Sequence, residues 1–517
     1  MQFALLSNAD LPELPIQGSV SALVGADQSA TPLLAQSFLN RLDITPFLSG
    51  MDEVFANALA GLEQTLFLSI YGLPLVVLWL MGGAIFFTLR MAFINIRAFP
   101  HAIAVVMGRY DNPDEPGEVT HFQALATALS ATVGLGNIAG VAIAIQLGGP
   151  GALLWMTLAG LLGMTSKFVE CTLGQKYRVV RPDGTIAGGP MYYLSQGLAE
   201  MGLKPLGQML AVSFALICIV ASFGGGNMFQ ANQSYVAIAS LIPFFTNHRW
   251  VYGLAIAAFV GLVIIGGIRR IGAVAGAITP IMAGIYILAA LWVLWVHADE
   301  IPNAFNTIFN QALNPRAAEG GFFGVMAQGI RRGIFSNEAG VGSAAIAHSA
   351  ARTDEPVREG IVALLEPFID TVVICNITGL VCIVTGAYMG SSAAGLNGVT
   401  LTAAAFASVM DWFPILLSVA VCLFAFSTMI SWSYYGERCW IYLFGDRTIL
   451  LYKFIFIVCA FLGAVNNLGA VLAFSDMMLF VMSFPSMLGG LLLSGQVAIS
   501  LEDYWRRLNA DQMPVYR

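Results

Sequence analysis

Charged residues are scarce in this chain of 517 residues, because Asp, Glu, Lys and Arg together make up only 10% of it. Hydrophobic residues make up 58%, and the mean hydropathy of +0.78 lies far outside the range of soluble proteins. This composition excludes a soluble globular protein and indicates a protein of the lipid bilayer. The net charge of −7 argues against nucleic acid as a partner.

Further absences narrow the class of function. The seven cysteines form no CxxC pair and no metal-ligand spacing, so we expect them to pack as small core residues. No Walker-type phosphate loop is present, which argues against transport driven by ATP. No nucleophile has a base or metal constellation beside it, so we expect no enzyme and no cofactor. All five histidines lie near the ends of predicted helices, and we expect them to be interfacial residues. They are His101, His121, His248, His297 and His348.

Long apolar runs recur along the chain. One helical crossing of a bilayer needs about 20 apolar residues, which predicts an all-α membrane protein with roughly eleven transmembrane helices. Residues 224–243 are polar at first and apolar afterwards, so they either extend the preceding helix or form a separate short one. The helices are expected at 66–92, 122–146, 150–174, 204–226, 250–268, 271–297, 322–349, 359–386, 412–437, 447–467 and 470–498.

The two ends of the chain are expected on opposite sides of the membrane. Residues 1–65 lack the basic start and the apolar run of a signal peptide, and we expect an extramembrane segment there. Most Lys and Arg residues fall on one side of the predicted crossings, and short cytoplasmic loops collect such residues. The tail at 499–517 is therefore expected in the cytoplasm and the amino terminus outside, in a multi-pass protein of the plasma membrane.

The predicted crossings group into two sets of five. With 66–92 set aside as an extra helix, residues 122–297 and 322–498 begin on opposite sides, which predicts an inverted repeat. The leading helix of each set is interrupted, by TVGLGN at Thr132–Asn137 and by FSNEAGVG at Phe335–Gly342. Paired interruptions indicate a transporter's midplane site, because unwound backbone can bind a carboxylate and a cation. The alternative is that these glycines are close-packing notches between helices.

VGLGN at 133–137 is similar to the first broken helix of the leucine-transporter fold. Three further motifs resemble the alanine or glycine:cation symporter family, which has a leucine-transporter-like fold. They are GGPGALLWM at 148–156, GGPMYYL at 188–194 and GIFSNEAGVGSAAIAHSAA at 333–351. The resemblance covers about residues 66–500. It implies a sodium-coupled symporter that imports small neutral amino acids, alanine or glycine, by alternating access, with sodium as the coupling ion.

A zwitterionic amino acid needs hydrogen-bond donors at one end and acceptors at the other. We expect N–H groups of the first interruption and the side chain of Asn137 to bind its carboxylate, and carbonyls of the second interruption to bind its ammonium. By the resemblance, Gln230, Thr428 and Trp432 complete the cavity, and Phe335 and Trp432 limit the size of the solute. The predicted substrate-binding residues are Thr132, Gly134, Gly136, Asn137, Gln230, Phe335, Ser336, Asn337, Thr428 and Trp432.

Sodium is a hard cation that prefers oxygen ligands. The resemblance places a sodium site between the first interrupted helix and the helix at 412–437. A Ser or Thr inside a helix can instead bond to its own helix, which is the structural alternative for the two hydroxyls. The expected ligands are the carbonyls of Ser130, Val133 and Ala425 and the hydroxyls of Ser427 and Thr428.

Two other functions are compatible with the same residues. A proton replaces sodium if Glu338, inside the second interruption, is the carrier of the coupling ion. A channel or solute sensor would use the cavity without pumping, but a channel needs a continuous polar path, which the aromatic density at the cavity disfavours. Arg331 and Arg332 are candidates for an external gate. Glu366 is expected to form a structural ion pair with a nearby base.

Overall fold

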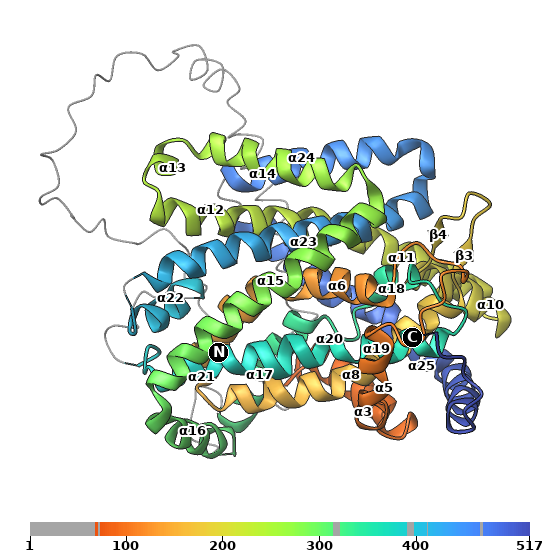
Figure 1. The fold of residues 1–517 in the computed structure, drawn as a ribbon, viewed down its shortest axis with the longest axis horizontal. Coiled ribbons are helices and arrows are strands. Elements are labelled where there is room, and N and C mark those ends of the chain that lie inside the picture. The colour runs from red at the N-terminus through yellow and green to blue at the C-terminus, as the bar shows by residue number, and fades with distance from the viewer. Residues whose placement is uncertain are drawn as a thin grey trace, which may run out of the picture. The chain divides into compact units, whose positions relative to one another are not determined.

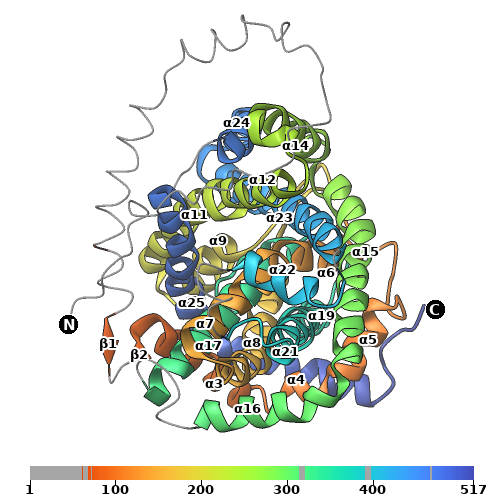
Figure 2. The ribbon, with the colours of Figure 1, turned by 90° about the vertical axis from the view of Figure 1, so that its left-hand side faces the viewer.

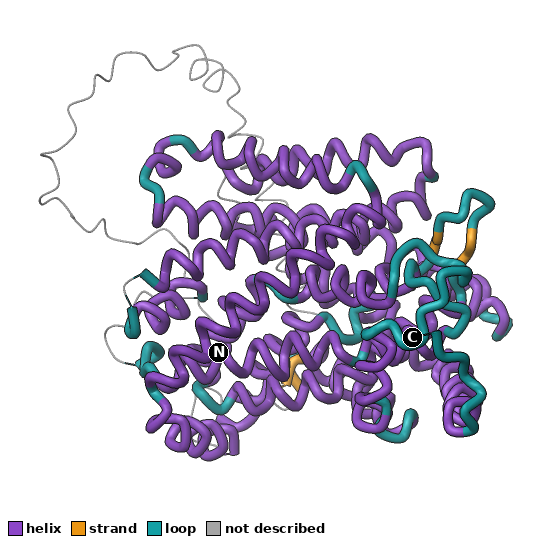
Figure 3. Tube along the Cα trace, viewed as in Figure 1, coloured by secondary structure: helices purple, strands orange, loops and turns teal. Residues whose placement is uncertain are grey.

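The computed structural model describes most of the chain after residue 60. The chain divides into units 1–50 and 51–517, and every described residue belongs to the second. The predicted extramembrane segment therefore lies outside the described residues, apart from residue 61. Nearly all of the described part is helical (Figure 3). The described residues are 61, 68–70, 73–313, 321–389, 398–410, 412–465 and 469–516.

Helices dominate the first half of the chain, and two short antiparallel strand pairs accompany them, β1 with β2 and β3 with β4. The bounds are β1 (Ser69–Ile70), β2 (Leu73–Pro74), α3 (Leu75–Arg90), α4 (Ile94–Arg97), α5 (Phe99–Val106), α6 (His121–Thr132), η1 (Gly136–Gly140), α7 (Val141–Gly148), α8 (Ala152–Lys176), β3 (Val179–Val180), β4 (Ile186–Ala187), α9 (Pro190–Tyr192), η2 (Tyr193–Gly197), α10 (Leu198–Glu200), α11 (Lys204–Phe223), η3 (Gly224–Met228), α12 (Phe229–Leu241), α13 (Phe244–Asn247), α14 (Arg249–Ile264), α15 (Gly267–Val296), η4 (Ala298–Glu300) and α16 (Ile301–Leu313).

The second half is built from helices as well, among them the long α23 and α25. Its elements are α17 (Gly321–Asn337), α18 (Ala344–Ser349), α19 (Pro356–Ala363), α20 (Leu365–Pro367), η5 (Phe368–Cys375), α21 (Asn376–Val384), α22 (Val399–Ala407), α23 (Phe413–Phe444), η7 (Asp446–Thr448), α24 (Ile449–Val465) and α25 (Gly469–Asn509). The elements η1, η2, η3 and η5 are π-helical turns, whereas η4 and η7 are 3₁₀ turns.

Several helices are long enough to cross a bilayer. Among the described residues, seven helical runs have the length and hydropathy of a span, and an eighth counts if α6 and the η1–α7 run form one bent span. Two shorter apolar helices, α3 and α14, add to these. The prediction of a helical membrane protein is therefore confirmed, while the count of eleven crossings and the inverted repeat stay predictions.

The predicted helix at 204–226 extends farther than expected. Its run continues through η3 and α12 to Leu241. Polar residues are tolerated here because they hydrogen-bond across to α24: the Asn227 Nδ2 donates to the Phe456 carbonyl at 2.7 Å, and the Asn232 Nδ2 donates to the Gly463 carbonyl at 3.3 Å. Of the two possibilities left by the sequence, continuation of the helix is the one observed.

The helices pack in two groups (Figures 1 and 2). In the first, called the α8 group, α8 packs against α17, α18 and α19, and α7 packs against α17. In the second, called the α23 group, α23 packs against α11 and α12, and α14 packs against α24. Two helices connect the groups: α15 packs against α6 and α23, and α6 packs directly against α23.

Glycine allows very close packing of α17 on α8. A Cβ atom at Gly329 would lie 2.2 Å from the Ala152 carbonyl oxygen and 2.8 Å from the Trp155 Cβ. Small residues at helix interfaces let backbones approach in this way, which increases the area of van der Waals contact between helices in a membrane. The packing of the α8 group therefore depends on the absence of a side chain at this position.

The substitution Gly329→Ala is expected to destabilise the protein by ~1–3 kcal/mol, because the new methyl group forces two helices apart. Thermal unfolding of the detergent-solubilised protein measures the loss. Gly284→Ala on α15 is the matched control, because no described atom beyond its chain neighbours and its own helix backbone lies within 4 Å of the position that the new methyl group would take. Equal melting temperatures for the two variants would contradict the packing argument.

Candidate functional site

The first predicted interruption is a real break in the helix. The helix α6 begins after Thr120, whose hydroxyl accepts from the Gln123 N–H while the Gln123 side chain accepts from the Thr120 N–H. It ends at Thr132, since Val133 has an extended ψ of 93°. The chain then re-enters η1 and α7 with a bend of 52°. The unwound residues therefore lie between two half-helices.

The second predicted interruption is also present. Helix α17 ends at Asn337 and α18 begins at Ala344. Between them, Glu338, Gly340 and Gly342 have positive φ angles of 54°, 90° and 93°. Such angles are costly for residues with a side chain, so the glycines suit the turn and Glu338 is a strained exception.

An asparagine closes each break in the same manner. The Asn137 Oδ1 accepts from the Gly134 N–H at 2.8 Å, and the Asn337 Oδ1 accepts from the Ala339 N–H at 3.0 Å. The amide groups of both asparagines donate to η5: Asn137 to the Asp370 carboxylate at 2.6 Å, and Asn337 to the Thr371 hydroxyl at 2.9 Å. Both breaks are therefore attached to one short π-helical segment.

Asp370 is the centre of these contacts. Its side chain is fully buried and accepts three hydrogen bonds, from Asn137 as above, from the Ser336 hydroxyl at 2.9 Å and from the Thr371 hydroxyl at 2.7 Å. A buried carboxylate is costly unless donors surround it, and here the donors come from both breaks. Asp370 thus holds the two breaks together, a role that the sequence did not reveal.

A cavity of about 40 Å³ lies between the two breaks and the α23 group. Seven of the predicted substrate-binding residues line it, whereas the other three, Asn137, Ser336 and Asn337, make the η5 contacts described above. Sequence reasoning missed other lining residues such as Phe229 and Leu479, which carry no polar signal. The seven are Thr132, Gly134, Gly136, Gln230, Phe335, Thr428 and Trp432.

Gln230 and Glu338 each bring an amide or carboxylate oxygen to the cavity. The Gln230 Nε2 donates to the Gly225 carbonyl at 3.1 Å, but the buried Gln230 Oε1 has no hydrogen-bond partner within the described residues. Glu338 lines the same cavity and accepts from the Ser343 hydroxyl at 2.5 Å. An unpaired buried acceptor is unfavourable, so Gln230 is suited to receive a donor from a solute.

Aromatic side chains limit the cavity on two sides. Trp432 is 2% exposed, and it packs so closely on α11–η3 that a Cβ atom at Gly226 would lie 2.4 Å from its Cγ. The Phe335 ring lies 6.2 Å from the ring of Phe480 and 5.9 Å from the Arg332 Cζ. These bulky residues leave little room for a solute with a long side chain.

The predicted sodium ligands Ser130, Ser427 and Thr428 lie together where α6 meets α23. The Ser130 carbonyl accepts from the Thr428 hydroxyl at 3.1 Å and from the Ser427 hydroxyl at 3.3 Å. The Ser130 hydroxyl donates to the Ser427 carbonyl at 2.7 Å and accepts from the Ser431 hydroxyl at 2.9 Å. The Ser427 hydroxyl also bonds to its own helix, at the Phe424 carbonyl. This cluster is rich in oxygen, as a hard cation requires.

The remaining predicted ligands, Val133 and Ala425, are buried at the break and on α23 respectively. Binding of a solute by the Gly134 N–H or by the Asn137 side chain would require these groups to leave the hydrogen bonds that they make to each other and to Asp370. The roles of these residues in binding stay predictions.

Two histidines differ from the expectation of interfacial positions. His121 and His348 are 1% and 0% exposed, and both contact the carboxylate of Glu359. A buried anion supplies the polar partner that water would supply at an interface. The expected ion pair of Glu366 is confirmed, because its Oε1 lies 2.9 Å from the Lys167 Nζ.

The substitution Asp370→Ala is expected to lower the free energy of unfolding by ~3 kcal/mol or more, because it leaves buried donors of both breaks unpaired. Asp370→Asn is the matched variant. Its amide keeps an acceptor for Asn137 and offers donors to the two hydroxyls, so less than half of the loss is expected. Thermal unfolding in detergent measures both, and an Asn variant as unstable as the Ala variant would contradict this account.

Comparison with known proteins identifies the family to which this chain belongs. A family model described as the sodium:alanine symporter family matches residues 56–517. The chain is 43% identical over 425 residues to the sodium/alanine symporter AgcS of Methanococcus maripaludis, covering 82% of this chain and 92% of that protein. It is 32% identical to the amino-acid carrier protein AlsT of Bacillus subtilis, over 88% of this chain and 96% of that one.

A solved structure shares the fold. The crystal structure of MhsT in complex with L-phenylalanine aligns with a TM-score of 0.52 at 15% identity, covering 72% of this chain and 88% of MhsT. The expected leucine-transporter-like fold is thereby confirmed, and the family match makes the protein a transporter and no enzyme. The chain belongs to the sodium:alanine symporter family of amino-acid–cation symporters.

Proposed function

We propose that this symporter imports alanine or glycine together with sodium. The observation that carries the proposal is the small cavity between the two breaks, bordered by the oxygen cluster of Ser130, Ser427 and Thr428. Solute and cation would then bind side by side at the unwound backbone, which lies at the centre of the helix bundle. The match to the sodium:alanine symporter family supports an amino acid as the solute. The relative AgcS, which aligns with 82% of this chain, is named a sodium/alanine symporter.

The size of the cavity supports a small solute. A water molecule needs ~10–15 Å³ of such volume, so 40 Å³ suits about three water molecules or an amino acid with a very short side chain. The ammonium group would donate to Gln230 Oε1 and to carbonyls near Phe335. The carboxylate would lie at the first break, near Thr132 and Gly136. Trp432 and Phe335 would exclude longer side chains sterically.

Thr428 supports coupling between the two ligands. It lines the cavity, and its hydroxyl also contacts the Ser130 carbonyl. A sodium ion bound by Ser130, Val133, Ala425, Ser427 and Thr428 would fix the geometry of the first break, which the solute then uses. Each ligand would raise the affinity of the other by the same factor.

Transport would proceed by alternating access across the plasma membrane. The two five-helix sets, residues 122–297 and 322–498, would form the inverted repeat around the cavity. The excess of Lys and Arg on one side supports a cytoplasmic carboxyl terminus and an outside amino terminus. In Figure 1 the carboxyl terminus lies beside α18 and α19, and this end of the bundle would face the cytoplasm.

Glu338 supports one alternative, coupling to protons. Its carboxylate lines the cavity and so lies within reach of the cargo. A proton on Glu338 would replace sodium as the coupling ion without a change in the substrate site. The experiment below separates the two, because a pH gradient alone would then drive uptake.

Purified protein in proteoliposomes is expected to concentrate radiolabelled alanine under an inward sodium gradient. Without sodium and without a pH gradient, concentrative uptake should vanish. Uptake driven by a pH gradient alone would establish the proton alternative and refute sodium coupling. Thr428→Val removes one sodium ligand at constant size, and we expect the sodium concentration for half-maximal uptake to rise at least tenfold, about 1.4 kcal/mol.

The matched control for this variant is Thr402→Val. Thr402 is also buried, and its hydroxyl donates to the carbonyl of Ile138 at 3.1 Å, but it does not line the cavity. A change of less than threefold is expected there. Equal effects of the two valine substitutions would contradict the placement of the sodium site.

Replacing Trp432 by Phe is expected to widen the range of solutes. A pocket discriminates one methylene group by ~1–3 kcal/mol, so valine uptake relative to alanine should rise at least tenfold. Trp440→Phe is the control, since the Trp440 indole donates to Thr448 at the far end of α23. Uptake of a panel of neutral amino acids measures the ratio, and an unchanged ratio in Trp432→Phe would exclude this residue as the limit on size.

A further inference from the structure

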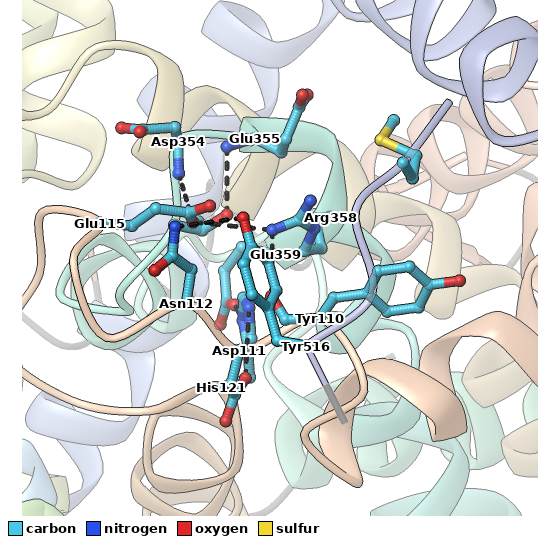
Figure 4. Close-up of polar contacts among 12 residues, drawn as sticks. Tyr110, Asp111, Asn112, Glu115, His121, Asp354, Glu355, Arg358, Glu359 and Tyr516 are labelled. Carbon is cyan, nitrogen blue, oxygen red and sulfur yellow. Dashed lines mark hydrogen bonds and ion pairs between the residues drawn. The ribbon is translucent and has the colours of Figure 1, made fainter. Parts of the chain in front are cut away.

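One buried carboxylate joins the two broken helices at the end of the bundle where the carboxyl terminus lies. Glu359 on α19 is 0% exposed. One of its oxygens contacts the Nδ1 of His121, the first residue of α6, and the other lies 2.5 Å from the Nδ1 of His348, in the last turn of α18. Figure 4 shows His121 beside Glu359, with Arg358 turned away toward Glu115. Each broken helix therefore supplies one imidazole to the same anion.

The backbone joins the same two half-helices. The segment before α6 pairs with the segment after α18: the Glu118 N–H donates to the Ala350 carbonyl at 2.9 Å, and the Arg352 N–H donates to the Val119 carbonyl at 2.8 Å. A Cβ atom at Gly117 would lie 2.3 Å from the Arg352 Cα, so the two backbones are in direct contact.

Arg178, which follows α8, strengthens this junction. Its guanidinium donates to the Pro116 carbonyl at 2.8 Å on one side, and to the carbonyls of Ser349 at 3.0 Å and Ala351 at 2.6 Å on the other. Hydrogen bonds from a charged donor are stronger than neutral ones. The start of α6 and the end of α18 are thus held by a carboxylate, a guanidinium and the backbone.

The outer nitrogens of the two imidazoles face further carboxylates. The His121 Nε2 lies 3.8 Å from the Asp111 Oδ1, and the His348 Nε2 lies 4.0 Å from the Glu366 Oε2. All four atoms are buried without a hydrogen-bond partner in the described part of the chain. A small movement would close either gap. Other charged or titratable groups around these residues are Lys167, Glu170 and Cys171 on α8, Arg178 after it, Glu115 before α6, and Arg358 on α19.

The charge on Glu359 makes its contacts with the two imidazoles stronger than neutral hydrogen bonds. Both imidazoles must carry a proton at Nδ1 to donate to the carboxylate. A second proton on either ring creates an imidazolium that compensates the buried anion, whereas two neutral rings leave it without an opposite charge.

The contact of α6 with α23 contains only neutral hydrogen bonds among the bonds described above, unlike the contact of α6 with α18 and α19. It is made by hydroxyl and carbonyl groups, those of Ser130 with Ser427, Thr428 and Ser431. Neutral hydrogen bonds contribute less than charge-assisted ones, so a movement of α6 relative to α23 costs less than a separation of α6 from α18.

We propose that Glu359, through His121 and His348, is a positioning residue that makes α6 and α18 move as one body during transport. The proposal rests on the alternating access proposed above. It predicts that these two half-helices stay together when the cavity opens at the carboxyl-terminal end of the bundle, and that the α6–α23 contact is the one that opens.

A disulfide across the junction tests this directly. Val119 and Ala351 are partners in an isolated parallel bridge, a spacing that a disulfide can span. The double variant Val119→Cys/Ala351→Cys is oxidised in proteoliposomes, and mass spectrometry of its peptides measures the cross-linked fraction. The oxidised protein is expected to keep at least half of the sodium-driven alanine uptake of its reduced form. A tenfold loss that reduction reverses would show that the half-helices separate, and would overturn the proposal.

The two single-cysteine variants are the controls for oxidation elsewhere. Uptake by the reduced double variant reports on the proposed symport, and the ratio of oxidised to reduced uptake reports on the junction. The two proposals therefore fail in different measurements.

The substitution Glu359→Gln gives a second readout, because it removes the charge at constant shape. In Glu359→Gln, we expect the maximal uptake rate to drop at least tenfold and the KM for alanine to change less than threefold. Glu359→Asp should restore part of the rate.

His101→Gln is the matched control at the same end of the molecule. Burial and the nearby Arg358 and Arg109 lower the pKa of His101 to about 4, so its ring carries no charge at neutral pH. Its removal should leave the maximal rate within threefold of that of the parent. If Glu359→Gln only reduced the yield of folded protein, and the remaining protein kept the maximal rate of the parent, Glu359 would be merely structural and the proposal would be refuted.

Discussion

A polypeptide cannot leave its backbone unpaired in hydrocarbon, and this constraint decides how the two broken helices are built. Each break frees N–H and carbonyl groups near the middle of a helix. In each, an asparagine two or three residues away accepts from a freed N–H and donates to η5. The breaks are therefore stable without a solute, and Asp370 and Thr371 hold them in register. At the cavity, by contrast, the described part of the chain leaves the Gln230 Oε1 without a hydrogen-bond partner.

Buried charges are distributed unequally between the two helix groups. The α8 group contains Lys167, which pairs with Glu366 on α20, and Glu359, which contacts His348 on α18 and His121 on the connecting helix α6. The α23 group contains its own pair, in which Glu437 lies 3.1 Å from the Lys453 Nζ. Where α6 meets α23, neutral hydroxyls make the contacts. Charged contacts thus join α6 to the α8 group, whereas neutral ones join it to α23, which suits a movement of α6 relative to α23.

The sequence allowed prediction of the helical fold, both breaks and seven residues of the cavity, because each has a local signal: apolar length, glycine with asparagine, or a family motif. It did not reveal Asp370 or Glu359 as junctions. Their partners Asn137 and His121 lie more than 200 residues away in sequence, and no local pattern predicts such a pairing. The assignment of Asn137 to the solute stays a prediction, and its contact with Asp370 on η5 is likewise one that no local pattern predicts.

The π-helical turn η3 has a consequence for the orientation of α12. One residue inserted into an α-helix rotates everything after it by about 100°, given 3.6 residues per turn. Gln230 and Asn232 both follow η3 and are rotated together by it. They lie two residues apart, about 200° around the helix, so Gln230 lines the cavity while the Asn232 amide donates to the Gly463 carbonyl of α24. A single helix thus presents polar side chains in two directions, one toward the scaffold and one toward the cavity.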